Sequence, residues 1–196
     1  MNLSILFDIQ AKLDERIVQE HRLQGQDLLD KKILALQVEL GELANEQRSW
    51  KFWSHDQKPR GQDDYLEYRP VDQGGNHWVN KNPLLEEYVD CLHFILSVGL
   101  ELEIDAANIK LVSRYYRNIT FAFNQIYSDV SVFGSIEDAE RNNIFDINSD
   151  NVKIAYEEIL GGFKRLGELL GFSWEQIEQA YLSKNQINHE RQANGY

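Results

Sequence analysis

The chain has 196 residues, with 20 Lys and Arg against 32 Asp and Glu, so its formal net charge is −12. At roughly 100–200 residues per domain, this length predicts a single domain over 1–196. The acidic balance argues against a surface that binds the phosphate backbone of nucleic acid. The single cysteine excludes a disulfide framework and a multi-thiolate zinc site, and it fits a reducing compartment.

The N-terminal segment lacks a basic lead-in followed by a long apolar run, so it is not typical of a secretory signal. The most apolar stretch, 91–100, contains His93 and Ser97 and is too short to cross a bilayer. We therefore expect a cytoplasmic protein that has neither a membrane nor a nucleic acid as its partner.

Hydrophobic spacing predicts about six helices and no sustained strand. The expected helices cover residues 3–22, 27–53, 83–103, 105–129, 151–170 and 173–187. Asp27 is expected to cap the second helix, and Ser173, with Gln176 three residues later, is expected to cap the sixth. The polar stretch 54–82 predicts a long loop or insertion, and 130–150 is expected to be irregular. The predicted fold class is an all-α helical bundle.

The placement of the acids is the most informative feature. On the second helix, Glu39 and Glu42 lie within about 60° of each other around the axis, beside the apolar seam and not opposite it. Glu87 and Asp90 repeat this spacing of three on a helix that is apolar on nearly all sides. A helix of that kind is buried, which predicts that its two acids are at least partly buried as well.

No Lys or Arg occurs in 33–47 or in 82–109, the stretches that contain these acids. Burying an unpaired carboxylate costs on the order of several kcal/mol or raises its pKa. Hard divalent cations would compensate, which predicts one or two Mg²⁺ ions, with Mn²⁺ as a substitute. Two such ions can activate water and stabilise a leaving phosphate. A di-iron carboxylate bundle is disfavoured because its E-x-x-H pairs are absent.

These acidic motifs, the segment Trp50-Lys51-Phe52-Trp53 between them and the apolar run 91–97 together resemble the dimeric dUTPases. That family belongs to the all-α NTP pyrophosphatase superfamily, with the MazG-like and dCTPase-like enzymes. The pattern K-N-x-x-N-x-x-R-Q at 184–192 is similar to the phosphate-binding end of the same family. The resemblance extends from about Leu6 to Tyr196, apart from the two irregular stretches.

The resemblance implies a homodimer that hydrolyses dUTP, with dUDP as a further candidate, to dUMP between the α- and β-phosphates with Mg²⁺. It implies that Glu42 also orients or deprotonates the attacking water. Asp14 stands where the family pattern has an asparagine, near the base or sugar. The resemblance assigns the metals to Glu39, Glu42, Glu87 and Asp90, the uracil edge to Gln10, the deoxynucleoside to Trp53 and His93, and phosphate oxygens to Lys184, Asn188 and Arg191.

Alternatives stay open at this point. The carboxylate motifs are shared across the superfamily, so dCTP or a modified nucleotide is a second candidate substrate. Glu46 lies between Glu39 and Glu42 in angle, one turn further on, and is a further candidate ligand. E-x-x-E is also frequent on ordinary helices, so a non-enzymatic helical interaction module, with the acids as surface charge, is the third alternative.

Overall fold

The computed structural model describes residues 2–61, 65–69, 77–142 and 149–195, and the account that follows concerns this part of the chain. The α-helices in it are α1 (Leu3–Glu20), α2 (Leu29–Gln47), α3 (Pro83–Glu101), α4 (Ile119–Arg141), α5 (Ser149–Leu169) and α6 (Trp174–Ala193). The prediction of an all-α bundle of about six helices is confirmed. None of the helices described is both long and apolar enough to span a membrane.

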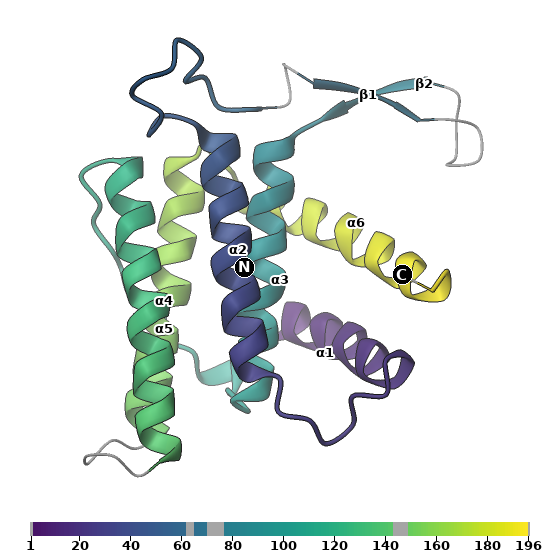
Figure 1. The fold of residues 1–196 in the computed structure, drawn as a ribbon, viewed down its shortest axis with the longest axis vertical. Coiled ribbons are helices and arrows are strands. Elements are labelled where there is room, and N and C mark those ends of the chain that lie inside the picture. Colours follow the sequence, from purple (N-terminus) through teal and green to yellow (C-terminus); the bar gives the residue numbers. More distant parts are fainter. Residues whose placement is uncertain (1, 62–64, 70–76, 143–148, 196) are drawn as a thin grey trace.

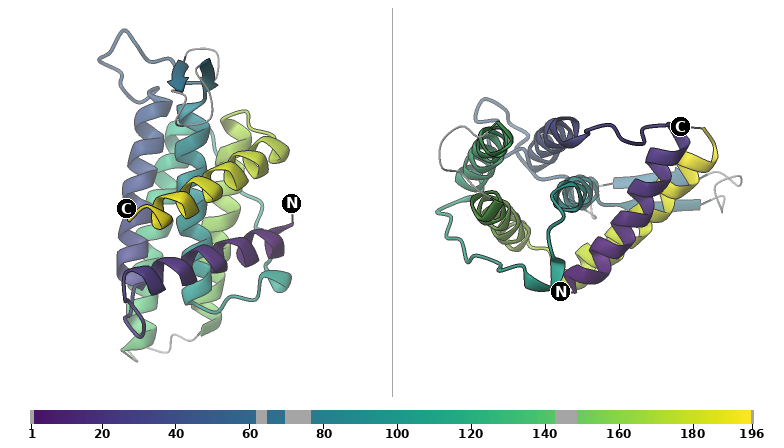
Figure 2. Two further views of the ribbon diagram at one scale, coloured as in Figure 1. Left: turned by 90° about the vertical axis from the view of Figure 1, so that its right-hand side faces the viewer. Right: turned by 90° about the horizontal axis from the view of Figure 1, so that it is seen from below.

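Helices α2, α3, α4 and α5 form a bundle in which α2 packs along α3 and α4 along α5 (Figure 1). Helices α1 and α6 lie side by side and cross α3 obliquely, as a second layer on one side of the bundle (Figure 2). The first and last helices of the chain therefore pack together against the central helix α3.

Helix α3 is the centre of the core, as its apolar sequence predicts. It contacts α1, α2, α5 and α6, and most of its side chains from Leu84 to Gly99 are buried. Two buried tyrosine hydroxyls each donate a hydrogen bond across this core. Tyr88 donates to the carbonyl of Phe163 at 3.1 Å, and Tyr156 donates to the carbonyl of Ile95 at 3.0 Å. These hydrogen bonds fix α3 against α5.

Helix α2 is shorter at both ends than the predicted range 27–53. It ends at Gln47 because Arg48 adopts a left-handed conformation, with φ 65°, and its N–H bonds to the carbonyl of Ala44. At the start, Leu28 occupies the N-cap position, and the carboxylate of Asp27 accepts the N–H of Leu29 at 3.1 Å.

The prediction of a helix over 105–129 followed by an irregular stretch over 130–150 is wrong for residues 105–118, which form no α-helix, and for residues 130–141, which do. Asp105 caps only the short 3₁₀ turn η3 (Ala106–Asn108). Helix α4 starts later, where the side chain of Asn118 accepts the N–H of Phe121 at 2.8 Å, and it continues to Arg141. Apolar periodicity alone does not locate these caps. Residues 143–148 of the expected irregular stretch lie outside the described part.

The stretch 54–82, expected to be a loop, contains an antiparallel hairpin. Its strands are β1 (Tyr65–Arg69) and β2 (His77–Lys81), with Tyr65 paired to Lys81, and it lies at the end of the bundle where α3 begins (Figure 1). Five of the ten strand residues are apolar or aromatic, but they do not alternate regularly with polar ones, so hydrophobic alternation did not reveal the strands. The Gly-Gly pair at 74–75 lies outside the described residues.

The predicted capping box at the start of α6 is confirmed. The hydroxyl of Ser173 accepts the N–H of Gln176 at 3.3 Å, and the side chain of Gln176 accepts the N–H of Ser173 at 2.9 Å. The helix continues to Ala193, six residues beyond the predicted end at 187. Its extra length places the whole K-N-x-x-N-x-x-R-Q pattern on one helix.

Replacing Gly161 with Ala is expected to lower the free energy of unfolding by about 1–3 kcal/mol. A Cβ at this position of α5 would lie 2.4 Å from the carbonyl oxygen of Val112, in the extended segment that crosses the helix, and a backbone atom cannot rotate away. Urea unfolding measures the change. The control is Gly134→Ala in α4, where the Cβ would meet only Ile33 at 3.9 Å. That change is expected to stabilise by about 0.5–1 kcal/mol, and equal effects of the two substitutions would contradict the packing argument.

Candidate active site

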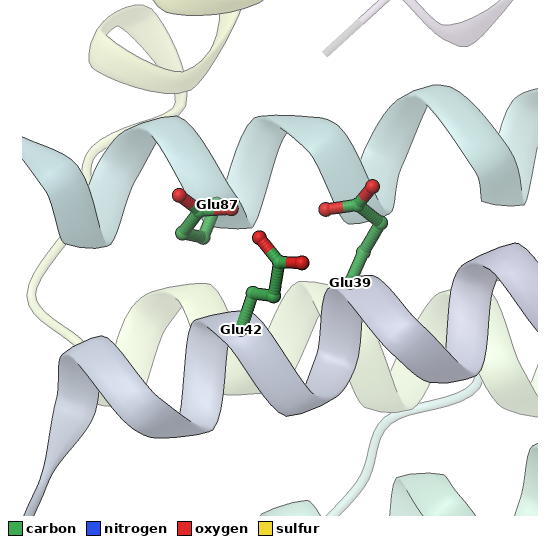
Figure 3. Close-up of side chains that lie close together, drawn as sticks. All are labelled: Glu39, Glu42 and Glu87. Carbon is green, nitrogen blue, oxygen red and sulfur yellow. The ribbon is translucent and has the colours of Figure 1, made fainter.

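Three carboxylates from two packed helices gather at one point. Glu39 and Glu42 come from α2 and Glu87 from α3, and they offer oxygens that all lie within 4.8 Å of one another (Figure 3). Glu42 is exposed, whereas Glu39 and Glu87 are partly buried. The spacing of three on each helix brings the two acidic motifs face to face, because α2 and α3 run along each other.

The pKa shifts in this cluster match the expectation that its acids have no basic partner. Burial, followed by the negative charges of Asp90 and Glu42, raises the pKa of Glu39 and that of Glu87 to about 7 each. None of the three cluster carboxylates has an ion-pair partner within the part of the chain that the structure describes. Three converging oxygen donors with this excess of negative charge fit a hard divalent cation such as Mg²⁺ or Mn²⁺.

Asp90, the fourth predicted ligand, lies outside this group of three and has a basic partner from a distant part of the sequence. The ammonium of Lys184 on α6 lies 2.6 Å from Asp90 and 3.0 Å from Glu86, and Lys81 lies 3.1 Å from the other oxygen of Glu86. Burial raises the pKa of Asp90, and Lys184 opposes the shift. Burial lowers the pKa of Lys184, but the charges of Asp90 and Glu86 outweigh this effect and raise it.

A cavity of about 460 Å³ opens beside the carboxylates, between α1, α2, α3 and α6. This volume lies in the usual range for small-ligand sites. Apolar side chains, among them Leu13, Ile17 and Phe94, line part of its wall. The predicted site residues that line it are Gln10, Asp14, Glu39, Asp90, His93, Lys184, Asn188 and Arg191.

The cavity is also lined by residues that the sequence did not single out. Phe94 and Ser97 follow His93 on α3, and Lys32 comes from the first turns of α2. Ser97 lies one turn after His93, so the spacing of four contained a signal for it. A lysine near the start of a helix carries no such signal, and only the fold shows that Lys32 faces α1.

Trp53 does not join these residues. It lies beyond the end of α2, with 63% of its surface exposed, and packs edge to face on Trp50 and Phe52. It is not part of the cavity wall of this chain, so its contact with the nucleoside stays a prediction. Glu46 is also outside the three-carboxylate group, although its backbone carbonyl accepts the N–H of Arg60 at 3.0 Å.

The family model for dUTPase matches residues 2–72 and 75–196, nearly the whole chain. The chain belongs to the dUTPase family. Membership of this all-α family confirms the resemblance and implies dUTP diphosphatase activity. A search of the curated proteins found no match.

In this dUTPase family member, the polar end of the cavity is built around the side chain of Gln10. The carbonyl oxygen of Gln10 lies 2.7 Å from the Tyr181 hydroxyl, which donates to it, and 2.7 Å from Nδ1 of His93. Its amide nitrogen donates to Asp14 at 2.7 Å. The rings of His93 and Tyr181 stack with their centroids 4.2 Å apart. Helices α1, α3 and α6 thus share one hydrogen-bonded cluster.

The pH dependence of folding is expected to contain a contribution from His93. Burial, with a smaller effect of the positive charge of Lys184, lowers the pKa of His93 to about 3, from an ordinary value near 6.5. Below pH 6.5 the unfolded chain binds a proton here and the folded chain does not, so this contribution is lost as the pH falls. Between pH 7.5 and 5.0 the wild type is expected to lose about 2 kcal/mol more stability than His93→Gln. Urea unfolding at both pH values measures this, and parallel curves would contradict the assignment.

Proposed function

We propose that this chain hydrolyses dUTP to dUMP and pyrophosphate in a Mg²⁺-dependent reaction, with dUDP as a second substrate. The observation that carries the proposal is a cluster of three carboxylates beside a cavity whose wall combines the cationic side chains of Lys184 and Arg191 with apolar side chains and the polar cluster at Gln10. A nucleoside triphosphate needs the same combination, because a flat base and a charged phosphate chain flank its sugar.

The polar and basic side chains of α6 suit the phosphates. Lys184, Asn188 and Arg191 are spaced by four and three residues, so they lie along one face of α6, and all three line the cavity. Catalysis of phosphoryl-group chemistry depends mainly on positioning and electrostatic stabilisation. We assign these three side chains to the phosphate oxygens.

The polar cluster at Gln10 suits the nucleoside. We assign Gln10 to the edge of the uracil and His93 to the same region, with Asp14 beside them. Phe94 adds an aromatic surface to this part of the wall. Aromatic side chains provide stacking surfaces for bases, at about 1–3 kcal/mol per base. Trp53 has no place in this assignment unless a second copy of the chain supplies it.

We assign the metal to Glu39, Glu42 and Glu87, with Asp90 as the fourth ligand. The cation would be Mg²⁺, or Mn²⁺ in its place, and it would supply charge stabilisation and an activated water. Glu42 is the exposed member of the cluster, and we assign it to orient the attacking water and accept its proton. Lys184 and Arg191 add positive charge where an acidic site alone would repel the substrate.

The proposal includes a cytoplasmic homodimer. Exposed apolar side chains support the dimer: Leu34 and Val38, four residues apart on one face of α2, are 61% and 52% exposed. Light scattering coupled to size-exclusion chromatography tests it. A mass of twice 22.9 kDa is expected, and a monomer at micromolar concentration would contradict it.

The function itself is tested with a panel of nucleotides. The protein is incubated with dUTP, dUDP, dCTP, dTTP, dATP and dGTP, each with Mg²⁺ or with EDTA, and the products are separated by chromatography. We expect dUMP from dUTP and from dUDP in the presence of Mg²⁺, and none with EDTA. A preference for dCTP would move the substrate to the alternative within the superfamily, and no hydrolysis of any nucleotide would favour a non-enzymatic interaction module.

A further inference from the structure

One acidic side chain near the carboxylate cluster belongs neither to that cluster nor to the cavity wall. Glu86 on α3 contacts two lysines that come from different parts of the fold. The ammonium of Lys184 on α6 donates to its Oε1 at 3.0 Å, and the ammonium of Lys81, the last residue of β2, lies 3.1 Å from its Oε2. Both oxygens of this carboxylate therefore have a cationic partner.

A glutamate at this position has an ordinary explanation. Glu86 lies in the first turn of α3, where a negative charge is favourable beside the partial positive charge of the helix N-terminus. That effect requires a charge but no particular partner, and a fully exposed side chain would supply it. The side chain of Glu86 is instead 32% exposed and lies between two ammonium groups, so the helix terminus does not account for its contacts.

Four charged side chains, Lys81, Glu86, Asp90 and Lys184, form one group in which the charges balance. Lys184 is 12% exposed and also lies 2.6 Å from Asp90, so it contacts two carboxylates that are one turn of α3 apart. A divalent cation ligated by Asp90 would change this balance. The cation would bind the carboxylate oxygens of Asp90 and would repel the ammonium of Lys184 beside them.

Glu86 is the carboxylate to which Lys184 can then turn. In the part of the chain that the structure describes, Lys184 forms ion pairs with Glu86 and Asp90, and its Nζ lies within 3.0 Å of both. The ammonium can therefore leave Asp90 while Lys184 remains in the cavity wall. The three side chains Lys81, Glu86 and Lys184 combine two positive charges with one negative charge, and this excess attracts phosphate.

We propose that Glu86 is a positioning residue which, oriented by Lys81, keeps the ammonium of Lys184 available to the substrate phosphates when Asp90 ligates a divalent cation. Glu86 itself contacts neither the metal nor the nucleotide in this arrangement. Lys81 holds one oxygen of Glu86, leaves the other for Lys184, and offsets a negative charge that would repel the phosphates. The inference rests on the proposed function and adds the residue that determines where its phosphate-binding lysine lies.

Glu86→Gln, alone and combined with Lys184→Met, tests the inference through Mg²⁺ binding, measured by calorimetry without nucleotide. In Glu86→Gln, Lys184 has Asp90 as its one remaining carboxylate and competes more strongly with the cation, so the Kd for Mg²⁺ is expected to rise about tenfold. Lys184→Met removes the competing ammonium, and its Kd is expected to fall below that of the wild type. In this background, Glu86→Gln is expected to change the Kd by less than about threefold.

Steady-state kinetics with saturating Mg²⁺ give a second readout. In Glu86→Gln, kcat/KM for dUTP is expected to fall about tenfold. Added to Lys184→Met, the same change is expected to cause no further fall, because the glutamate acts through the lysine. A contribution of Glu86 to the helix terminus alone would instead lower activity by the same factor in both backgrounds.

Glu175→Gln is the matched control. It makes the same change in the first turn of α6, outside the cavity wall, and it is expected to keep the wild-type Kd and kcat/KM. Equal effects of Glu86→Gln in the two backgrounds, on the Kd or on kcat/KM, overturn the inference. A Mg²⁺ affinity in Lys184→Met that is no tighter than in the wild type overturns it even if Glu86→Gln does not fold. If the wild type binds Mg²⁺ but hydrolyses no nucleotide, the proposed function fails, and the Mg²⁺ titrations still decide the role of Glu86.

Discussion

Glu42→Gln is expected to lower Mg²⁺-dependent hydrolysis of dUTP by roughly 10²–10⁴-fold, the range for losing a general base. The amide has nearly the same shape as the carboxylate, but it cannot take a proton from water and is a poor ligand for a hard cation. Steady-state kinetics with saturating Mg²⁺ measure the loss. Full activity of this variant would contradict the role assigned to Glu42.

The same substitution is expected to make the metal-free protein at least as stable as the wild type. The charge of Glu42 contributes to the raised pKa of Glu39 and of Glu87, so its removal relieves repulsion inside the cluster. A stabilising variant that loses activity is typical of a functional site. Glu46→Gln is the control, because Glu46 is one turn away and outside the cluster, and it is expected to leave activity and Mg²⁺-dependent stabilisation unchanged. Thermal unfolding with and without Mg²⁺ compares the three proteins.

Lys184→Met is expected to affect both activity and folding. The variant loses a cation from the phosphate end of the cavity, and kcat/KM for dUTP is expected to fall by on the order of a hundredfold. It also leaves Asp90 without its partner at 2.6 Å, at a site where both side chains are less than a fifth exposed. Leaving a charged group unpaired there is expected to cost about 1–3 kcal/mol of the free energy of unfolding at pH 8.

A second substitution separates these two effects. Asp90→Asn in the Lys184→Met background removes the unpaired charge, so it is expected to recover much of the stability and none of the activity. Lys164→Met is the control on an exposed pair, Lys164 with Glu168, and it is expected to change the free energy of unfolding by about 0.5 kcal/mol or less. Equal losses in Lys184→Met and Lys164→Met would contradict the partly buried ion pair.

Periodicity located the long helices well where the pattern was strong. The nearly continuous apolar run of α3 predicted a buried central helix, and its observed bounds, Pro83–Glu101, differ from the predicted ones by two residues at most. The error at α4 has a specific cause. Residues 105–118 are apolar enough to suggest a helix, but their conformation is set by the close passage over Gly161 and by the contacts of Arg114 with Asp129 and Glu158. These are long-range contacts that no local pattern contains.

At the candidate site, too, the sequence pattern predicted part of the arrangement and missed contacts between helices. The two acidic motifs predicted that four carboxylates converge. Glu39, Glu42 and Glu87 do so, because two packed helices bring matching faces together, whereas Asp90 lies outside this group. The ion pair of Asp90 with Lys184 and the contact of Lys32 with Asp14 were not predicted. The first joins α3 to α6, which are far apart in the sequence, and the second joins the consecutive helices α1 and α2. Both contacts depend on how α1 and α6 cross the bundle (Figure 2).

A crystal structure with Mn²⁺ and a non-hydrolysable dUTP analogue tests the central claim most directly. Anomalous diffraction identifies the metal independently of the protein coordinates. We predict a Mn²⁺ peak bounded by the carboxylates of Glu39, Glu42 and Glu87, with the uracil at Gln10 and the phosphates along α6. A metal bound elsewhere, or a base beside Asn188 and Arg191 instead of Gln10, would contradict this account.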